Sequence, residues 1–202
     1  MKKFAFAAAA LAATAATPAF AQDSGTTVYV GPVVGYDSVS LSDGTDSESS
    51  DGVLYGVVAG VDFNLAPGMF VGAEAEFTDS DVGETVSDID VVGDSASLEA
   101  GRSLYVGARV GANVGEMAKV YVKGGYSNAK IEGSYDDTVD VFTVDDELDG
   151  WVLGAGAEAR FSPVVVRLEY RYADYNEIEF GGVSSGIDMS RHQVVLGALL
   201  AF

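Results

Sequence analysis

Hydrophobic and polar residues alternate along the end of the chain, from Ile187 to Phe202. From His192 onward the even positions are nearly all apolar, whereas the odd positions begin with Arg191 and Gln193. A period of two is typical of a β-strand with two unlike faces. Seven earlier segments alternate in the same way. The eight expected strands are Thr27–Ser40, Val53–Asn64, Met69–Thr78, Leu98–Val114, Lys119–Ile131, Trp151–Phe161, Val164–Tyr175 and Asp188–Phe202.

The segments that connect these strands alternate in length. Tight turns are expected at Leu65–Gly68, Gly115–Met117 and Ser162–Pro163. Short turns at one end and long loops at the other are the layout of an outer-membrane barrel. We therefore expect an all-β fold, an eight-stranded antiparallel up-and-down transmembrane β-barrel with periplasmic turns and extracellular loops. The long polar loops are expected at Leu41–Gly52, Asp79–Ser97, Glu132–Gly150 and Asn176–Ile187.

The glycines indicate which face of each strand points inward. Along the strands they share parity with the charged residues, as Gly107 does with Arg109. The interior of an eight-stranded barrel is just wide enough for side chains, so long charged groups need small neighbours there. On a wet outer face the same glycines would only weaken the strands. The expected lumen charge network is Asp62, Glu74, Glu76, Arg109, Lys119, Lys123, Glu158, Arg160, Arg167, Glu169 and Arg171.

The opposite face is apolar and carries aromatic residues at its two ends. A secreted barrel of the lipocalin type, apolar inside and polar outside, is the alternative. Two aromatic girdles a membrane's thickness apart favour the membrane barrel. The expected girdles are Tyr36, Phe77, Tyr126, Trp151 and Tyr172 near the loops, and Phe63, Phe161 and Phe202 near the turns.

The start of the chain has the pattern of a secretory signal. Lys2 and Lys3 precede an apolar segment, and the small residues Ala19 and Ala21 fit a cleavage site. We expect a cleaved signal peptide over 1–21 and a barrel domain over 22–202, an uncleaved membrane anchor being the alternative. The 202-residue chain has no Cys and a net charge of −20, which excludes disulfides and argues against nucleic acid as a partner.

Two stretches near the end, Gly154–Pro163 and Arg167–Tyr172, resemble the last hairpin of the opacity-type, porin-like outer-membrane barrels of Gram-negative bacteria. This family is related in architecture to the OmpA and OmpX barrels. The resemblance implies an eight-stranded barrel in the bacterial outer membrane, in contact with lipid and lipopolysaccharide. It also implies that the terminal Phe202 is the signal read by the barrel assembly machinery. A monomer without cofactors is expected.

The charged residues allow two kinds of site. The lumen charges are expected to pair into a ladder that fills the bore, with a gated ion path as the alternative. The acidic loops could gather divalent cations, and Asp145, Glu147 and Asp149 have the spacing that begins a calcium-binding loop. The twelfth position of that pattern is Gly156 instead of Glu, so solvation of a mobile loop is preferred.

Catalysis has one candidate set, in which Ser190, His192 and Asp188 share a face of the last strand. Such barrels include lipid A-modifying enzymes with a Ser–His pair. Residues two apart on a strand lie about 6.5–7 Å apart, too far for a nucleophile–base hydrogen bond unless the side chains lean together. We therefore expect no enzyme, but a surface-exposed structural or adhesin-like protein. The alternatives are a small porin and, less favoured, a lipid A-modifying enzyme.

Overall fold

The computed structural model describes residues 25–42, 47–66, 68–87, 95–136, 141–175, 179–180, 183–184 and 188–202. The expected signal peptide lies outside these residues. No helix among them is long and apolar enough to cross a membrane. The strands are β1 (Thr26–Ser42), β2 (Ser47–Ala66), β3 (Met69–Ser80), β4 (Gly83–Ser87), β5 (Ser95–Val114), β6 (Ala118–Asp136), β7 (Val141–Phe161), β8 (Val164–Tyr175), β9 (Glu179–Phe180), β10 (Val183–Ser184) and β11 (Asp188–Ala201).

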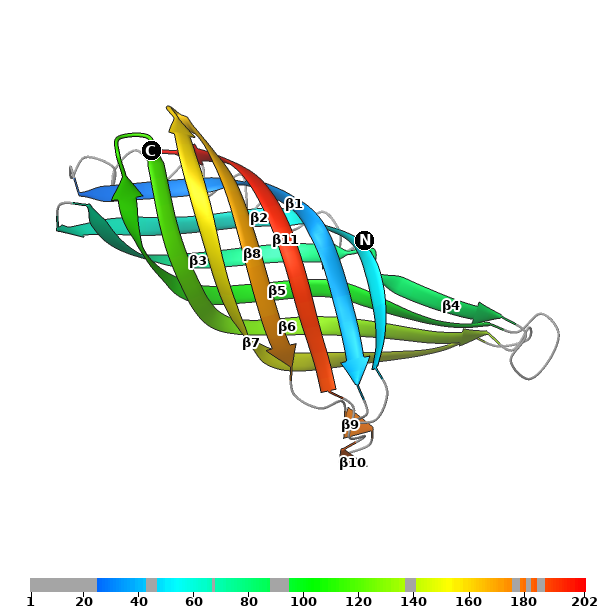
Figure 1. Cartoon of the computed structure of the whole chain (residues 1–202). Helices are drawn as coiled ribbons and strands as arrows, with labels where there is room; N and C mark the ends of the chain where they lie inside the picture. The colour runs from blue at the N-terminus through cyan, green and yellow to red at the C-terminus, as the bar shows by residue number, and fades with distance from the viewer. Residues whose placement is uncertain are drawn as a thin grey trace.

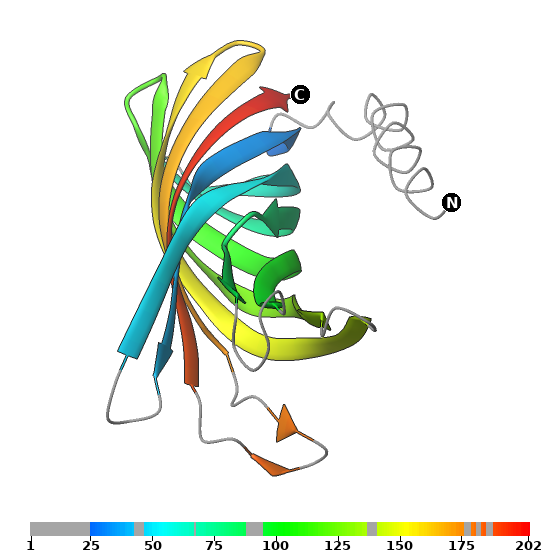
Figure 2. The same ribbon diagram turned by 90° about the vertical axis from the view of Figure 1, so that its right-hand side faces the viewer.

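Eight of these strands close into an antiparallel barrel (Figures 1 and 2). Their order is β3-β2-β1-β11-β8-β7-β6-β5, and β3 also pairs with β5 to close the circle. The first and last strands are neighbours, so the end of the chain seals the wall. Phe202 exchanges two backbone hydrogen bonds with Val28, at 2.9 and 3.2 Å. Each expected strand corresponds to one strand of the wall, and the predicted fold is confirmed.

The short turns and the C-terminus lie at one end of the barrel, opposite β4 and the β9–β10 hairpin (Figure 1). Gly68 and Gly115 occupy two of these turns with φ angles of 86° and 72°. Positive φ is accessible to glycine without steric cost, which is why glycine stands at these tight corners. We call this end of the barrel the turn side and the opposite end the loop side.

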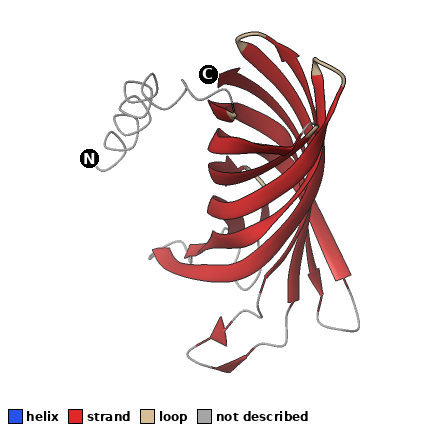
Figure 3. Cartoon of the chain, turned by 90° about the vertical axis from the view of Figure 1, so that its left-hand side faces the viewer, coloured by secondary structure: helices blue, strands red, loops and turns tan. Residues whose placement is uncertain are grey.

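Three of the four predicted long loops are wrong in extent, because most of their residues form strand; the fourth, Asn176–Ile187, has the predicted bounds, since β8 ends at Tyr175 and β11 begins at Asp188. β1 and β2 pair as far as Ser42 and Ser47, and β6 and β7 as far as Asp136 and Val141. Above the membrane no face of a strand has to meet lipid, so the sequence loses its apolar alternation there. The backbone hydrogen-bond ladder needs no apolar face and continues. The red strands in Figure 3 show how far the wall extends at this end.

Side chains alternate between the lumen and the outer face all round the wall. The outer face is apolar, with Leu153 and Val106 each 56% exposed. The expected girdle residues point outward too, among them Tyr126 at 53% and Phe161 at 62% exposure. The buried side chains of the lumen include aromatic, aliphatic and charged groups. The barrel therefore has an apolar exterior and a packed, largely polar bore, as the parity of the glycines predicts.

Candidate functional site

Ten of the eleven predicted lumen charges meet in one ion-pair network across the bore. Nine of them are at least nine-tenths buried, and Lys119, whose side chain is 19% exposed, lies at the edge of the network. Six strands of the wall contribute, since acids come from β2, β3, β7 and β8 and bases from β5, β6 and β8. The buried members are Asp62, Glu74, Glu76, Arg109, Lys123, Glu158, Arg167, Glu169 and Arg171.

The turn-side half of the network centres on Arg109. Its guanidinium holds Asp62 through two hydrogen bonds of 2.7 and 2.8 Å, and it contacts Glu158 at 2.6 Å. Such a two-pronged bond fixes both partners in orientation as well as distance. Arg167 follows, 2.9 Å from Glu158 and 2.6 Å from Glu74. Arg167 thereby joins acids from β7 and β3 across the bore.

The loop-side half continues from Glu74 through Lys123 to Arg171. Lys123 Nζ lies 2.8 Å from both Glu74 and Glu169. Arg171 pairs with Glu169 and also donates to Glu76 at 2.6 Å. Buried charges are costly unless each is paired and hydrogen bonded, and this chain of alternating signs meets that condition. This chain of ion pairs fills the middle of the bore.

Tyrosines, which are not among the predicted lumen residues, complete the packing of this network. Tyr29 donates a 2.8 Å hydrogen bond to Glu74, and the Arg109 guanidinium lies 4.3 Å from the centre of the Tyr29 ring. A Cβ atom added at Gly107 or Gly156 would collide with the hydroxyl of Tyr105 or Tyr121. The lumen glycines therefore make room for tyrosine hydroxyls, besides the long charged chains considered from sequence.

A second buried pair, Asp37 with Arg191, lies apart from the first. Asp37 accepts hydrogen bonds from Arg191, from Gln193 at 3.0 Å and from Ser80 at 2.7 Å. The alternation along the last strand places Arg191 and Gln193 on its polar face, but their partner Asp37 is not among the predicted lumen charges. Asp37 has the same parity along β1 as Val33 and Val39, which point into the lumen. This parity was the signal in the sequence that Asp37 is also a lumen residue.

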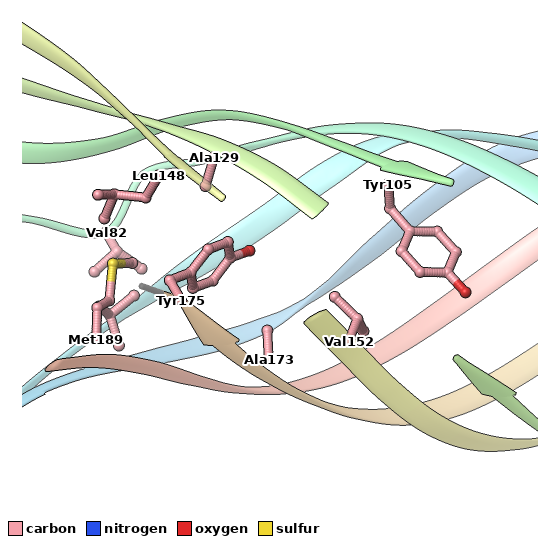
Figure 4. Close-up of a cluster of buried hydrophobic side chains, with 9 residues drawn as sticks. Val82, Tyr105, Ala129, Leu148, Val152, Ala173, Tyr175 and Met189 are labelled. Atoms are coloured by element: carbon pink, nitrogen blue, oxygen red, sulfur yellow. The ribbon is translucent and has the colours of Figure 1, made fainter. Parts of the chain in front are cut away.

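An apolar cluster closes the loop-side end of the bore (Figure 4). Its members come from six strands and from Val82, which lies between β3 and β4, so the cluster spans the lumen. Below it lies a pocket of only about 10 Å³, about the space of one water molecule. The cluster consists of Val39, Val82, Tyr105, Ala129, Leu148, Val152, Ala173, Tyr175 and Met189.

Arg160 differs from the prediction, because it joins none of the ion pairs among the described residues. It lines a cavity of about 240 Å³ at the turn-side mouth, together with Lys119 and Glu116. Its strand ends at Phe161, so its side chain reaches wider, wetter space than the middle of the bore. A destabilisation of about 3–5 kcal/mol on removing this arginine, which would follow if it were paired, is therefore not expected.

The three candidate metal ligands lie on strand β7 and not in a loop. Glu147 pairs with Arg102 at 2.8 Å, and Asp149 accepts hydrogen bonds from Tyr126 and Asn128. These two donors hold the pKa of Asp149 below its usual range. The side chain of Asp145 is outside the description, and the described residues form no group of three metal-ligating side chains. An extended strand separates side chains that a calcium loop would bring together.

The candidate catalytic histidine contacts aromatic residues. His192 Nδ1 lies 2.7 Å from the Tyr170 hydroxyl, and its ring centre is 5.0 Å from that of Tyr172. Ser190 is hydrogen bonded to Tyr172, and the side chain of Asp188 is outside the description. The structure thus gives His192 and Ser190 separate partners, within an outward aromatic cluster that includes Trp151.

Comparison with known proteins agrees with this architecture. The model of the outer membrane protein β-barrel domain family matches residues 6–202. The chain belongs to this family. It is 32% identical over 133 residues to the 31 kDa outer-membrane immunogenic proteins of Brucella melitensis and Brucella suis. That match covers 62% of the chain and 55% of each relative, so it spans about half of the Brucella proteins.

Solved outer-membrane barrels share the fold. Ail, the attachment invasion locus protein of Yersinia pestis, superposes with a TM-score of 0.53 at 16% identity, over 88% of this chain and 99% of Ail. Neisserial surface protein A gives a TM-score of 0.52 at 14% identity, over 87% of this chain and 97% of its own. The protein is thus an outer-membrane β-barrel of Gram-negative bacteria. The family relationship also confirms the resemblance and the outer-membrane location predicted from the sequence.

Proposed function

We propose that this protein is a non-enzymatic surface protein whose interaction site is a projecting sheet above the loop-side girdle. The projecting sheet consists of β4 and the loop-side parts of β5 (95–102), β6 (128–136) and β7 (141–149). It is an extension of one side of the barrel wall (Figure 1). The observation that carries the proposal is the free edge of this sheet along β7.

The edge arises because the neighbours of β7 end at different heights. β6 pairs with β7 from Val141 onward, whereas β8 pairs with it only from Gly150 onward. From Val141 to Asp149 one row of backbone donors and acceptors therefore has no strand partner among the described residues. An open edge of this kind is a template for an added strand. The natural ligand of such an edge is an extended segment of another protein.

The charge of the edge suggests the chemistry of that segment. Its sequence includes Asp145, Asp146, Glu147 and Asp149, so a strand rich in Lys or Arg would be attracted and correctly oriented. The Brucella relatives are named immunogenic and Ail is named for attachment and invasion. Both names support a role for such barrels at the cell surface.

A synthetic peptide of alternating Lys and Val tests the proposal. With the isotope-labelled barrel in lipid nanodiscs, its addition should shift the amide NMR signals between Val141 and Asp149. The charge-reversing pair Asp145→Lys/Asp146→Lys should abolish the shifts, whereas Glu116→Lys on the turn side should leave them. Absence of shifts on β7, or their persistence in the edge variant, would refute the proposed surface.

A small channel is the alternative, and the lumen argues against it. An ion that crosses the barrel would have to pass the buried network around Arg167 and then the apolar cluster around Met189. Both obstacles consist of side chains from several strands, so neither opens by moving one loop. Conductance measurements distinguish the two functions directly.

A further inference from the structure

The turn-side mouth of the bore contains the cavity of about 240 Å³ that Arg160 lines. Its lining comes from β1, β2, β5, β6, β7, β8 and β11, so the cavity lies across the bore. Arg109 forms its inner end together with its partners Asp62 and Glu158. Since the short turns of such barrels face the periplasm, the cavity is accessible to periplasmic solutes.

Arg160 gives this cavity a positive charge that is free to bind a ligand. Its backbone N–H donates to the carbonyl of Met117 at 2.7 Å, which fixes the end of β7. Its guanidinium, however, makes no ion pair with any residue that the structure describes. Lys119, the other cation near the mouth, is held by Asp62 at 2.9 Å. A guanidinium binds a carboxylate through two parallel hydrogen bonds, so Arg160 is suited to a ligand with this group.

Aliphatic side chains lie next to Arg160 at the same height of the barrel. Arg160 is opposite Val165 in the pairing of β7 with β8, and Val165 is opposite Leu199 in the pairing of β8 with β11. Both aliphatic residues line the cavity, and they are 7% and 1% exposed. A ligand whose carboxylate binds Arg160 therefore places its next carbon atoms against these two side chains. The site favours a carboxylate attached to a small apolar group over a bare anion.

The outer rim of the cavity carries two side-chain amides. Asn64 on β2 and Asn113 on β5 line the cavity, and both residues are exposed. Their backbone N–H groups donate to the carbonyls of Gly25 and Gly68, each at 2.8 Å, so their backbone positions are fixed. A side-chain amide offers donors and an acceptor, which match those of a peptide group. The rim is therefore suited to the peptide group that precedes a C-terminal residue.

We propose that the turn-side cavity binds the C-terminal carboxylate of a periplasmic peptide that ends in small apolar residues. Arg160 binds the carboxylate, Val165 and Leu199 contact the last side chain, and the amides at the rim bind the preceding peptide group. A cavity of about 150 Å³ accommodates a benzene-sized molecule, so this one has room for about ten non-hydrogen atoms, the size of an alanyl-alanine terminus. The site lies at the opposite end of the barrel from the projecting sheet, and the inference is independent of the proposed function.

N-Acetyl-alanyl-alanine is the probe, in its L,L form and in its D,D form. Fragments of secreted proteins supply the L configuration and cell-wall peptides supply the D configuration, so the pair distinguishes two sources of the same chemical group. With the isotope-labelled barrel in lipid nanodiscs, at least one form should shift the amide NMR signals of Met117, Arg160 and Val165 saturably. A ligand of this size is expected to have a Kd of about 0.1–1 mM.

Two related molecules test what the site recognises. The C-terminal amide of the same peptide has no negative charge, so it loses the charged hydrogen bonds and should bind at least about tenfold more weakly. Acetate keeps the charge but lacks the apolar and peptide contacts, and it should also bind at least about tenfold more weakly. Equal binding of the amide, or equal binding of acetate, would overturn the proposal.

Three variants locate the site. Arg160→Gln removes the charge and should weaken binding by about tenfold or more. Val165→Phe fills the space beside Arg160 and should abolish saturable binding. Val166→Phe is the matched control, because Val166 is the next residue of β8 but points to lipid and is 44% exposed. This control should bind the peptide like the wild type.

Heat-dependent gel mobility verifies that each variant is folded. If Val165→Phe fails to fold, Arg160→Gln decides alone, since this arginine has no ion pair to lose among the described residues. The proposal is overturned if neither form of the peptide shifts the three signals, if Arg160→Gln binds like the wild type, or if Val166→Phe weakens binding as much as Val165→Phe.

Discussion

Arg167 lies at the centre of the lumen network, and its replacement by Met is expected to destabilise the barrel by about 3 kcal/mol. The side chain is fully buried and contacts Glu74 and Glu158. Removing one partner of a buried ion pair costs about 3–5 kcal/mol, because an uncompensated charge is left behind. Here Glu74 keeps Lys123 and Glu158 keeps Arg109, which places the cost at the lower end of that range.

Urea unfolding from lipid vesicles, followed by Trp151 fluorescence, measures this loss. Arg160→Met is the matched control, because Arg160 has no ion pair in the described structure and should lose less than about 1 kcal/mol. The double variant Arg167→Met/Glu158→Gln should recover part of the stability, since it removes an acid together with its base. Equal stability of the Arg167 and Arg160 variants would refute the paired network.

Three further outcomes are expected. Gly156→Val should destabilise the barrel by about 1–3 kcal/mol, because the added side chain would overpack against the Tyr121 hydroxyl. Gly124→Ala should cost less than about 1 kcal/mol, because its Cβ atom would meet only the end of the Leu153 side chain. Equal unfolding midpoints of the two variants would contradict this expectation. In hydrogen exchange by NMR, alternate amides from Val141 to Asp149 should exchange fast, and uniform protection would show that the edge is covered. Tyr126→Phe should raise the pKa of Asp149, so that the carboxylate protonates at higher pH in a carbon-13 NMR titration; an unchanged pKa would show that the hydroxyl does not hold it.

The sequence predicts the barrel wall well because one face of each strand meets lipid. That requirement imposes the apolar alternation seen from Val164 to Tyr175, and glycine parity then identifies the inner face. The same reasoning fails above the membrane. Between Glu132 and Gly150 the strands no longer have a face against lipid, so the sequence has polar residues at both parities and resembles a loop, although Leu148 still packs into the apolar cluster of the lumen. The projecting sheet, on which the proposed function depends, was missed for this reason.

Membership of the lumen network follows from parity, but its pairings do not. Arg167 and Glu74 are on strands far apart in the sequence, and the stagger of the closed barrel decides which side chains meet. Asp37 was missed because it follows Tyr36 in a mostly apolar strand and was not considered with the charged residues. Arg160 has the parity of a lumen residue, but it lies at the turn-side end of β7, beyond the middle of the bore where the network is. Position along the barrel axis thus decides which charges are buried.

Single-channel conductance of the refolded mature protein in a planar bilayer tests the closed lumen most directly. The network around Arg167 and the apolar cluster around Met189 fill the bore at different heights. We expect no resolved openings at moderate voltage in concentrated salt, with folding verified in the same sample. Steady openings whose size increases with salt concentration would contradict the closed bore and would favour the channel over the surface role.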